Sequence, residues 1–358
     1  MLKVRALIDI NNLMRFLIIS LSTVIVGCAS TSLSPLKLEN SGIRPINQNT
    51  LSSEGEPINT DANPTGVVWQ LMPEAPGGLI AQGNGLFVSL VKPTTSPKVI
   101  AEVGYQPYIS TNGRDWAPAP SRIPVSGRSL IFANGWFYDA GEGVPPHNNL
   151  GVIVRSKDGL NWEEVFSRGS HPFTTIRYLN GGFVATGQNG VVATSLDGKH
   201  WQQQQIKNVS AFYDADYFEG EYLLTGDAMA LYSSKNLANW QNLSTENLLG
   251  AGSRNLQHNS DTLLLQTEDY VYIYRNKHWL SKKLPKDDNG FDYYINKLSP
   301  LSEDFVVTNK NKQVLRSQDG MNWQTLSQLQ SADSSTTCES RCIIYNYQIV
   351  KLPKGSIK

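Results

Sequence analysis

The chain has 358 residues, of which 31 are basic and 31 acidic, so its formal net charge is zero. Its basic residues do not cluster, and the electrostatic footprint of a nucleic-acid-binding protein is therefore absent. The length exceeds that of a typical single domain, although a closed array of repeats of this size folds as one unit.

The first part of the chain is predicted to be a targeting segment. An apolar run over residues 16–26 follows Arg15. It is shorter than the about 20 residues that a membrane-spanning helix needs, but it suits a secretory signal. Just beyond it, the tetrapeptide Ile-Val-Gly-Cys ends at Cys28 and resembles the lipobox of bacterial lipoproteins, whose cysteine is lipidated and becomes the mature N-terminus. An ordinary signal peptide with a chance cysteine is the alternative, and Met14 is an alternative start to Met1.

The resemblance divides the chain into a signal peptide over residues 1–27, a lipidated tether over 28–65 and a folded domain over 66–358. Ser, Asn, Pro and Thr are frequent in the tether and periodicity is weak, as in flexible linkers. Ala29 and Ser30 stand where inner-membrane retention favours Asp. The resemblance therefore implies an anchor in the outer membrane on its periplasmic face, with surface exposure as the alternative, and the lipid as the only membrane contact.

Export also bears on the two remaining cysteines, Cys338 and Cys342. An even pair in an oxidising compartment predicts a disulfide that closes a small loop. A two-cysteine metal site is the alternative, but no His partners lie nearby. No cofactor and no metal are predicted.

A tryptophan recurs at intervals of about 40 residues, and this period indicates a repeat architecture. Four of these tryptophans end a heptad that reads Ser-x-Asp-Gly-x-x-Trp, with Asn in place of Asp in the first copy. The Asp or Asn and the Trp of the four copies are Asn112 and Trp116, Asp158 and Trp162, Asp197 and Trp201, and Asp319 and Trp323. Trp69, Trp240 and Trp279 keep the period with decayed motifs.

The heptad resembles the Asp-box, or bacterial neuraminidase repeat, of sialidases and many non-catalytic β-propellers, over about residues 66–350. In the expected geometry, the Asp or Asn oxygen accepts backbone N–H bonds across a hairpin turn, Gly is left-handed and Trp packs on the sheet. These aspartates are therefore interpreted as structural turn residues. Catalysis or metal binding by Asp158, Asp197 and Asp319 is the alternative.

A second marker, a tight turn such as Asn-Gly before an apolar strand, recurs from Asn84 onwards. The two markers together predict four short antiparallel strands per period, the pattern of a β-propeller blade. The expected fold is all-β, a seven-bladed β-propeller, with six or eight blades as alternatives. An outer strand near residues 67–71 is expected to complete a last blade with inner strands near 341–345 and 348–352, so that the two ends of the chain close the ring.

A binding surface is predicted on the face opposite to these turns, over the first two blades. Its connections are longer than those of the later blades, and the excess lies in residues 91–107 and 141–151. Long loops on a rigid ring commonly carry function. The candidate binding residues are Tyr105, Arg122, Arg128, Glu142, His147, Arg168 and His171. Neutral variation of surface loops is the alternative.

The sialidase resemblance does not extend to a convincing active site. The tripeptide Arg-Ile-Pro from Arg122 matches part of the motif of the first substrate-binding arginine, but Ser121 replaces the aromatic residue and a heptad precedes the motif. Arg254 and Arg275 have no diagnostic context. The serine-hydrolase, zinc-protease and phosphate-loop motifs are absent. The chain is therefore predicted not to be an enzyme.

Asp214 and Asp216 lie beside Tyr213 and Tyr217 on a predicted innermost strand. We interpret the two aspartates as solvated residues of the axial channel, and acid/base catalysis or cation binding is the alternative.

Three functions are compatible with these features. The first is a non-catalytic scaffold or accessory factor that binds a protein partner in the envelope. The second is a carbohydrate-binding or glycan-cleaving propeller with its ligand in the axial pocket. The third is a structural surface protein without a discrete ligand. Neither the partner's identity nor the oligomeric state is indicated by the sequence.

Overall fold

The computed structural model sets residues 41–358 apart as one compact unit. The described residues are 43, 69–72, 75–92, 104–244, 252, 255–267, 270–283, 294–296, 305–308, 314–325, 329–331, 342–344 and 349–350. The predicted signal peptide, the lipidation site Cys28 and Cys338 of the predicted disulfide lie outside them, so these remain predictions. In the part of the chain that is described, no helix is long and apolar enough to cross a membrane.

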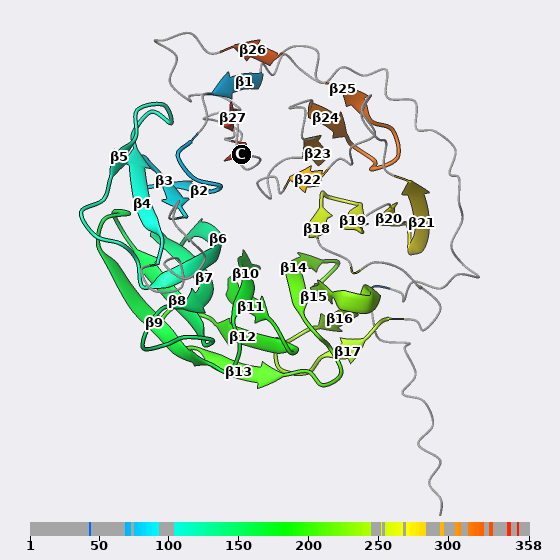
Figure 1. Ribbon diagram of the computed structural model, residues 1–358. Helices are drawn as coiled ribbons and strands as arrows, with labels where there is room; N and C mark the ends of the chain where they lie inside the picture. Colours follow the sequence, from blue (N-terminus) through cyan, green and yellow to red (C-terminus); the bar gives the residue numbers. More distant parts are fainter. Residues whose placement is uncertain are drawn as a thin grey trace, which may run out of the picture. The chain divides into compact units, whose positions relative to one another are not determined.

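The described strands form seven four-stranded sheets (Figure 1). In six sheets, four consecutive strands pair antiparallel in sequence order. The first sheet contains β2 (Leu79–Gly83), β3 (Leu86–Val91), β4 (Gln106–Ser110) and β5 (Ala117–Pro118). The second contains β6 (Val125–Ala133), β7 (Trp136–Gly143), β8 (Gly151–Ser156) and β9 (Trp162–Gly169). The third contains β10 (Phe173–Leu179), β11 (Gly182–Gly187), β12 (Val191–Ser195) and β13 (Gln202–Gln205).

The next three sheets repeat this order. The fourth contains β14 (Phe212–Phe218), β15 (Glu221–Gly226), β16 (Leu231–Ser234) and β17 (Gln241–Asn242), with a 3₁₀ turn η4 (Asp227–Met229) between β15 and β16. The fifth contains β18 (Asn255–His258), β19 (Leu263–Gln266), β20 (Tyr270–Arg275) and β21 (His278–Lys283). The sixth contains β22 (Tyr294–Asn296), β23 (Phe305–Thr308), β24 (Val314–Ser317) and β25 (Gln324–Thr325).

The first hairpin of each well-marked period has the predicted turn. Asn84 and Gly85 both have positive φ, 50° and 74°, as a type I′ turn requires. The same holds for the pairs Asn134-Gly135, Asn180-Gly181 and Glu219-Gly220. The Asn-Gly signal therefore located these hairpins correctly, and the following strands carry the buried side chains of the core.

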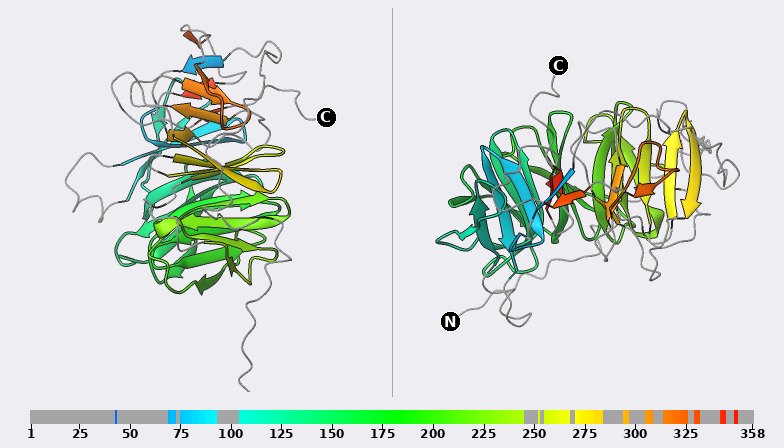
Figure 2. Two further views of the ribbon diagram at one scale, coloured as in Figure 1. Left: turned by 90° about the vertical axis from the view of Figure 1, so that its right-hand side faces the viewer. Right: turned by 90° about the horizontal axis from the view of Figure 1, so that it is seen from above.

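Consecutive sheets lie side by side around a common axis (Figures 1 and 2). Their first strands contact one another in sequence: β2 with β6, β6 with β10, β10 with β14, and β14 with β18. This arrangement is an all-β propeller, as predicted. That all seven sheets are blades of one closed ring stays a prediction.

The seventh sheet joins the two ends of the chain but differs from the expected order. Strand β1 (Trp69–Met72) pairs in parallel with both β26 (Leu329–Ser331) and β27 (Cys342–Ile344), and β27 pairs with β28 (Ile349–Val350). The prediction that an N-terminal strand completes this sheet is confirmed. Its placement as the outermost strand was wrong, because β26 supplies a further strand beyond it.

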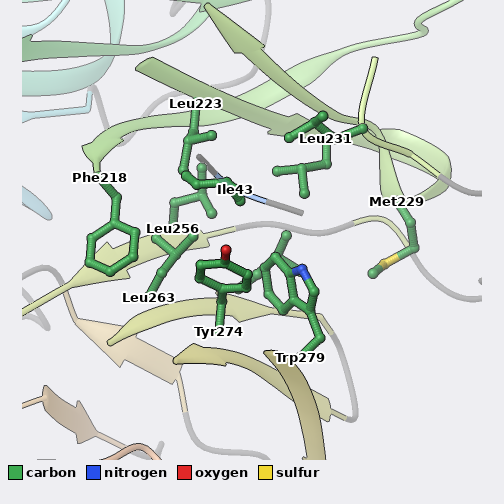
Figure 3. Close-up of a cluster of buried hydrophobic side chains, with 11 residues drawn as sticks. Ile43, Phe218, Leu223, Met229, Leu231, Leu256, Leu263, Tyr274 and Trp279 are labelled. Carbon is green, nitrogen blue, oxygen red and sulfur yellow. The ribbon is translucent and has the colours of Figure 1, made fainter. Parts of the chain in front are cut away.

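The hydrophobic core is divided into clusters, each lying between two neighbouring sheets. We call the apolar space between two such sheets a seam. Side chains alternate between the two faces of each strand, so each sheet contributes to the seam on either side. The seam between sheets β14–β17 and β18–β21 contains Leu223, Leu231, Tyr274 and Trp279 (Figure 3). It also contains Ile43, which is fully buried and comes from the predicted tether.

Candidate functional site

The heptad turns connect the third and fourth strands of their sheets and close on themselves. In the β8–β9 turn, Oδ1 of Asp158 accepts the backbone N–H groups of Leu160 and Asn161 at 2.9 and 2.8 Å. The Asn161 side chain donates to Oδ2 at 2.9 Å, and Ser156 donates its hydroxyl to Oδ1 at 3.0 Å. Partial burial raises the pKa of Asp158, but the hydrogen bonds, led by those from Asn161, outweigh it and lower this pKa to about 2.

The other two aspartates accept hydrogen bonds from the same positions of their turns. At Asp197, the backbone N–H of His200, followed by its imidazole at 2.7 Å from Oδ2, holds the pKa of the carboxyl below its usual range. At Asp319, burial raises the pKa, whereas hydrogen bonds from Asn322 and Met321 lower it further than burial raises it. Both oxygens of each carboxylate thus accept hydrogen bonds from donors of their own turn, an arrangement typical of structural turn residues.

The first heptad reaches the same geometry with the two side-chain types exchanged. Asn112 stands at the Asp position, and its Oδ1 accepts the backbone N–H groups of Arg114 and Asp115, each at 2.9 Å. Its Nδ2 donates to the Asp115 carboxylate at 2.7 Å. Where Asp158 accepts from Asn161, Asn112 therefore donates to Asp115, and one amide faces one carboxylate in both turns.

A further heptad turn was missed in the sequence. The turn before Trp240 was interpreted as decayed, yet Oδ1 of Asn236 accepts the backbone N–H groups of Ala238 and Asn239, both at 3.0 Å, and the hydroxyl of Ser234 at 3.2 Å. Leu237 replaces the glycine and still has a φ of 62°. Scoring Ser and Asn at their spacing from Trp240, without requiring glycine, would have found it.

The predicted binding residues lie at the opposite ends of the strands, which we call the loop face. There Arg128 and Glu142 form an ion pair at 3.7 Å, and His147 lies 3.8 Å from Glu164. His171 hydrogen-bonds through its two ring nitrogens with Ser170 and Asn189. Tyr105 donates its backbone N–H to Val125, Arg122 donates to the Gly104 carbonyl at 3.4 Å, and Arg168 is exposed near the end of β9. Residues 93–103 of the long first loop lie outside the described residues.

The structure thus pairs two of the candidates, Arg128 and Glu142, and does not assemble the seven into one site. Two pairings are direct, and Glu164, which the sequence did not suggest, belongs to one of them. Burial raises the pKa of Tyr105 and the charge of Asp139 adds to this effect, whereas the Ser126 side chain and the charge of Arg128 oppose it. The sialidase-type arginines are separated, because Arg122 lies in the β5–β6 connection on the loop face and Arg275 ends β20 at the turn face. Arg254 lies outside the described residues.

The interpretation of Asp214 and Asp216 as solvated channel residues was wrong. Asp214 is completely buried and accepts from Arg177 Nε at 3.1 Å and from the Leu256 backbone N–H at 2.9 Å. Asp216 is 8 % exposed and lies 2.9 Å from Nδ1 of His258. The partners come from β10 and β18 on either side of β14. Because burying a carboxylate without partners is costly, these contacts fasten three innermost strands together.

A pocket of about 410 Å³ opens beside the contacts of Asp214 and Asp216, at the inner edge of sheets β10–β13, β14–β17 and β18–β21. Its lining includes Arg177, Tyr178, Asn180, Asp216, Tyr217 and His258. Tyr178 is among the few large apolar side chains that are exposed in the described part of the chain. The pocket therefore combines aromatic rings with positively and negatively charged hydrogen-bonding side chains. It lies on the axial side of the sheets, where the carbohydrate hypothesis expects the ligand.

The most unusual titratable group is Asp139 in the middle of β7. It is completely buried, and among the described residues neither carboxylate oxygen accepts a well-formed hydrogen bond, although the backbone amides of Ser129 and Ala140 lie near it. Burial raises the pKa of Asp139 well above its usual value, and the backbone amides of Ser129 and Ala140 offset only part of this effect. Gly127 makes room for it, since a Cβ there would lie 2.2 Å from Oδ2 of Asp139. Its position in an apolar strand gave no sequence signal.

No group of three or more His, Cys, Asp or Glu side chains that could hold a metal ion occurs within the described ranges. The chain is by its fold a β-propeller protein. No protein-family model and no curated protein matches it.

Solved structures with a similar arrangement exist. YCF48 bound to D1 peptide has 14 % sequence identity and a TM-score of 0.47, over 80 % of this chain and 88 % of that chain. The WD40 β-propeller domain of Doa1 has 11 % identity and a TM-score of 0.47, over 70 % and 82 %. YCF48 from Cyanidioschyzon merolae has 10 % identity and a TM-score of 0.43, over 57 % and 73 %.

Proposed function

We propose that the chain is a non-catalytic, lipid-anchored propeller of the Asp-box type that binds an envelope protein through the loop face of sheets β2–β5 and β6–β9. Lipidation at Cys28 places it at the periplasmic face of the outer membrane. The protein serves as a scaffold or accessory factor, with no cofactor.

The proposal rests on the charged side chains of the loop face, which contribute little to the stability of the fold. Arg128 and Glu142 are 45 % and 30 % exposed in their side chains and stand 3.7 Å apart, and His147 and Glu164 are similarly exposed at 3.8 Å. Exposed ion pairs of this kind contribute roughly 0–1 kcal/mol to folding. Their side chains can therefore re-pair with a partner at little cost, while charged patches of this type govern the rate and specificity of association.

A charge exchange tests the surface without removing the ion pair. In the double variant Arg128→Glu with Glu142→Arg, the internal attraction is kept and the pattern shown to a partner is inverted. We expect capture of the envelope partner from detergent-solubilised membranes to fall at least about tenfold, with the melting temperature unchanged. Lys199→Glu, which alters an exposed residue on the turn face, is the matched control and should retain the partner. Equal capture by wild type and the exchanged variant would refute the surface.

The anchor has its own test. Cys28→Ser should release the protein from the membrane fraction into the soluble periplasmic fraction, with partner binding by the purified protein retained. Membrane association that survives this substitution would contradict the lipid anchor.

The axial pocket supports a second candidate, the binding of a carbohydrate. Sugar sites commonly pair an aromatic platform with side chains that hydrogen-bond hydroxyl groups, and Tyr178, Asn180 and His258 offer both. Titration of the protein with sialylated and unsialylated oligosaccharides measures this directly. Binding that is lost in Tyr178→Ala but kept in Arg128→Glu would favour the carbohydrate function. Release of free sugar, abolished by Tyr178→Ala, would make the protein a glycosidase.

A further inference from the structure

Four of the heptad turns approach the sheet that precedes their own in the chain. A Cβ on Gly159 would lie 2.6 Å from Val88 of sheet β2–β5, and one on Gly198 would lie 2.2 Å from the hydroxyl of Tyr138. A Cβ on Gly320 would lie 2.4 Å from Leu264 of sheet β18–β21. Leu237 stands at the glycine position of the fourth turn and belongs to the cluster shared with sheet β10–β13. The heptad turn of one sheet thus helps to fill the seam between that sheet and the preceding one.

Sheet β18–β21 has no such turn. Its third and fourth strands are joined by Asn276 and Lys277 alone, both with positive φ, and Arg275 pairs directly with His278. Tyr274 stands opposite Leu263 in the register, at the place where the serine of a heptad stands in the other sheets. The seam between β14–β17 and β18–β21 therefore lacks the element that fills the corresponding space elsewhere.

Ile43 occupies this seam. Its side chain is 0 % exposed and lies between Leu223 and Leu231 of one sheet and the rings of Tyr274 and Trp279 of the other (Figure 3). It is separated from every other member of the cluster by at least about 170 residues of chain, so its burial fixes the position of a distant residue at an entropic cost. Burial of an isoleucine side chain from water contributes enough to oppose that cost.

We infer that the seam between sheets β14–β17 and β18–β21 is an intramolecular docking site, and that its occupant is Ile43 of the N-terminal extension. Ile43 acts as what we call a peg: its apolar side chain occupies the space that a heptad turn fills in other seams, and it attaches the chain to the propeller at residue 43. The absence of a heptad in one sheet and the burial of a remote isoleucine at that same seam are two independent observations with one explanation.

The peg has a consequence that rests on the proposed lipid anchor. With the chain held at residue 43, only residues 28–42 separate the lipid from the propeller, a span of at most about 50 Å when fully extended. A tether that was free up to residue 65 would reach more than twice as far. The peg would thereby reduce the longest distance that the chain allows between the lipid and the propeller by more than half.

Thiol labelling tests the peg directly. In a full-length background with Cys28→Ser, the substitution Ile43→Cys places a thiol in the seam, and Leu196→Cys places one at a residue that is 77 % exposed. We expect an aromatic disulfide reagent to label position 43 about a hundredfold more slowly than position 196, and the two rates to become equal in denaturant. Equal rates in the native protein would overturn the inference.

A second pair of variants covers the case in which the cysteine itself loosens the site. Ile43→Asp should lower the melting temperature by several degrees, because a charge would have to enter the seam or leave it empty, whereas Leu196→Asp should not. An unchanged melting temperature in Ile43→Asp would count against the peg. Neither measurement uses the lipid or a partner, so failure of the proposed function would leave these outcomes unaffected.

Discussion

Two seams between neighbouring sheets meet the same packing demand in different ways. Between β6–β9 and β10–β13, the heptad turn before Trp201 lies against Tyr138, whose ring is 4.6 Å from that of Phe183. Between β14–β17 and β18–β21, a two-residue turn leaves the space open, and Ile43 fills it beside Trp279. The first solution is local in sequence and is repeated, whereas the second recruits a distant segment.

The difference shows that the heptad is one way to fill a seam and is not required for a sheet of this fold. Where the heptad is lost, the tryptophan is retained and becomes more deeply buried. Trp279 is 1 % exposed, while Trp162, Trp201 and Trp323 are only partly buried and two of them donate a hydrogen bond to their own turn. The two kinds of seam should therefore respond differently to the same substitution.

The largest effect is expected at the seam without a heptad. Trp279→Ala should destabilise the protein by about 3–5 kcal/mol, because a fully buried indole is replaced by a cavity. Trp201→Ala, at the seam with a heptad, should cost clearly less, since this ring is partly exposed and solvent can fill the space. Urea denaturation of both variants measures the difference, and equal costs would abolish the distinction between the seams.

The next effect tests how tightly the heptad turn approaches its neighbour. Gly198→Ala should cost about 2–3 kcal/mol, because the new Cβ would meet Tyr138 and φ at this residue is +70°. Gly181→Ala is the matched control. It has a similar φ of +82° with nothing within 4 Å of the added Cβ, and it should cost only about 1 kcal/mol. Thermal unfolding of the pair isolates the contribution of the contact, and a control as damaging as Gly198→Ala would leave backbone strain as the sole cause.

Buried and turn carboxyls should respond to pH in opposite directions. The pKa of Asp139 is raised in the folded state, so its share of stability is fully present below the unfolded pKa and is lost as the pH rises through the folded pKa. The pKa of Asp319 is lowered, so its share is present above the unfolded pKa and is lost as the pH falls through the folded pKa.

Melting temperatures measured across pH 3–8 reveal this contrast in two variants. The melting temperature of Asp139→Asn should increase relative to that of wild type as the pH rises, because the neutral amide avoids the burial of a charge. The melting temperature of Asp319→Asn should decrease relative to that of wild type over the same interval. Parallel curves for wild type and Asp139→Asn would show that Asp139 has an ordinary pKa.

The smallest effect concerns the exchange of amide and carboxylate between heptad turns. Asp158→Asn alone places two amides opposite each other and should cost about 0.5 kcal/mol at this partly buried turn. Adding Asn161→Asp recreates the arrangement of Asn112 and Asp115, so the double variant should recover the lost stability. A double-mutant cycle by urea denaturation measures the coupling, and additive losses would refute the equivalence of the two turns.

Much of the architecture followed from sequence, and the errors have identifiable causes. The Asn-Gly hairpins and the four complete heptads were predicted residue by residue, because both depend on backbone conformations and short-range hydrogen bonds. The turn at Asn236 was missed because Leu237 adopts a left-handed conformation that normally signals glycine. Strand β26 was missed because its outer position depends on pairing with β1 from the other end of the chain.

The candidate site was predicted less well. The binding surface was predicted from loop length alone and stays a prediction. The charged residues named for it lie on the loop face, but their ion pairs could not be read from spacing. Asp214 was taken for a solvated residue because its partners, Arg177 and Leu256, lie 37 and 42 residues away on other sheets. Asp139 carried no signal at all, since nothing in a strand sequence shows whether a carboxyl will find a partner.

The sequence by itself determined the turns, the strand alternation and hence the β-propeller, because each depends on residues within one period that interact across a few positions. Only the tertiary structure decided how the sheets are joined: which buried carboxyl has a partner, which strand completes the last sheet and where Ile43 is buried. These outcomes depend on contacts between residues far apart in the chain, and the free energy of such contacts exists only once the sheets have been brought together.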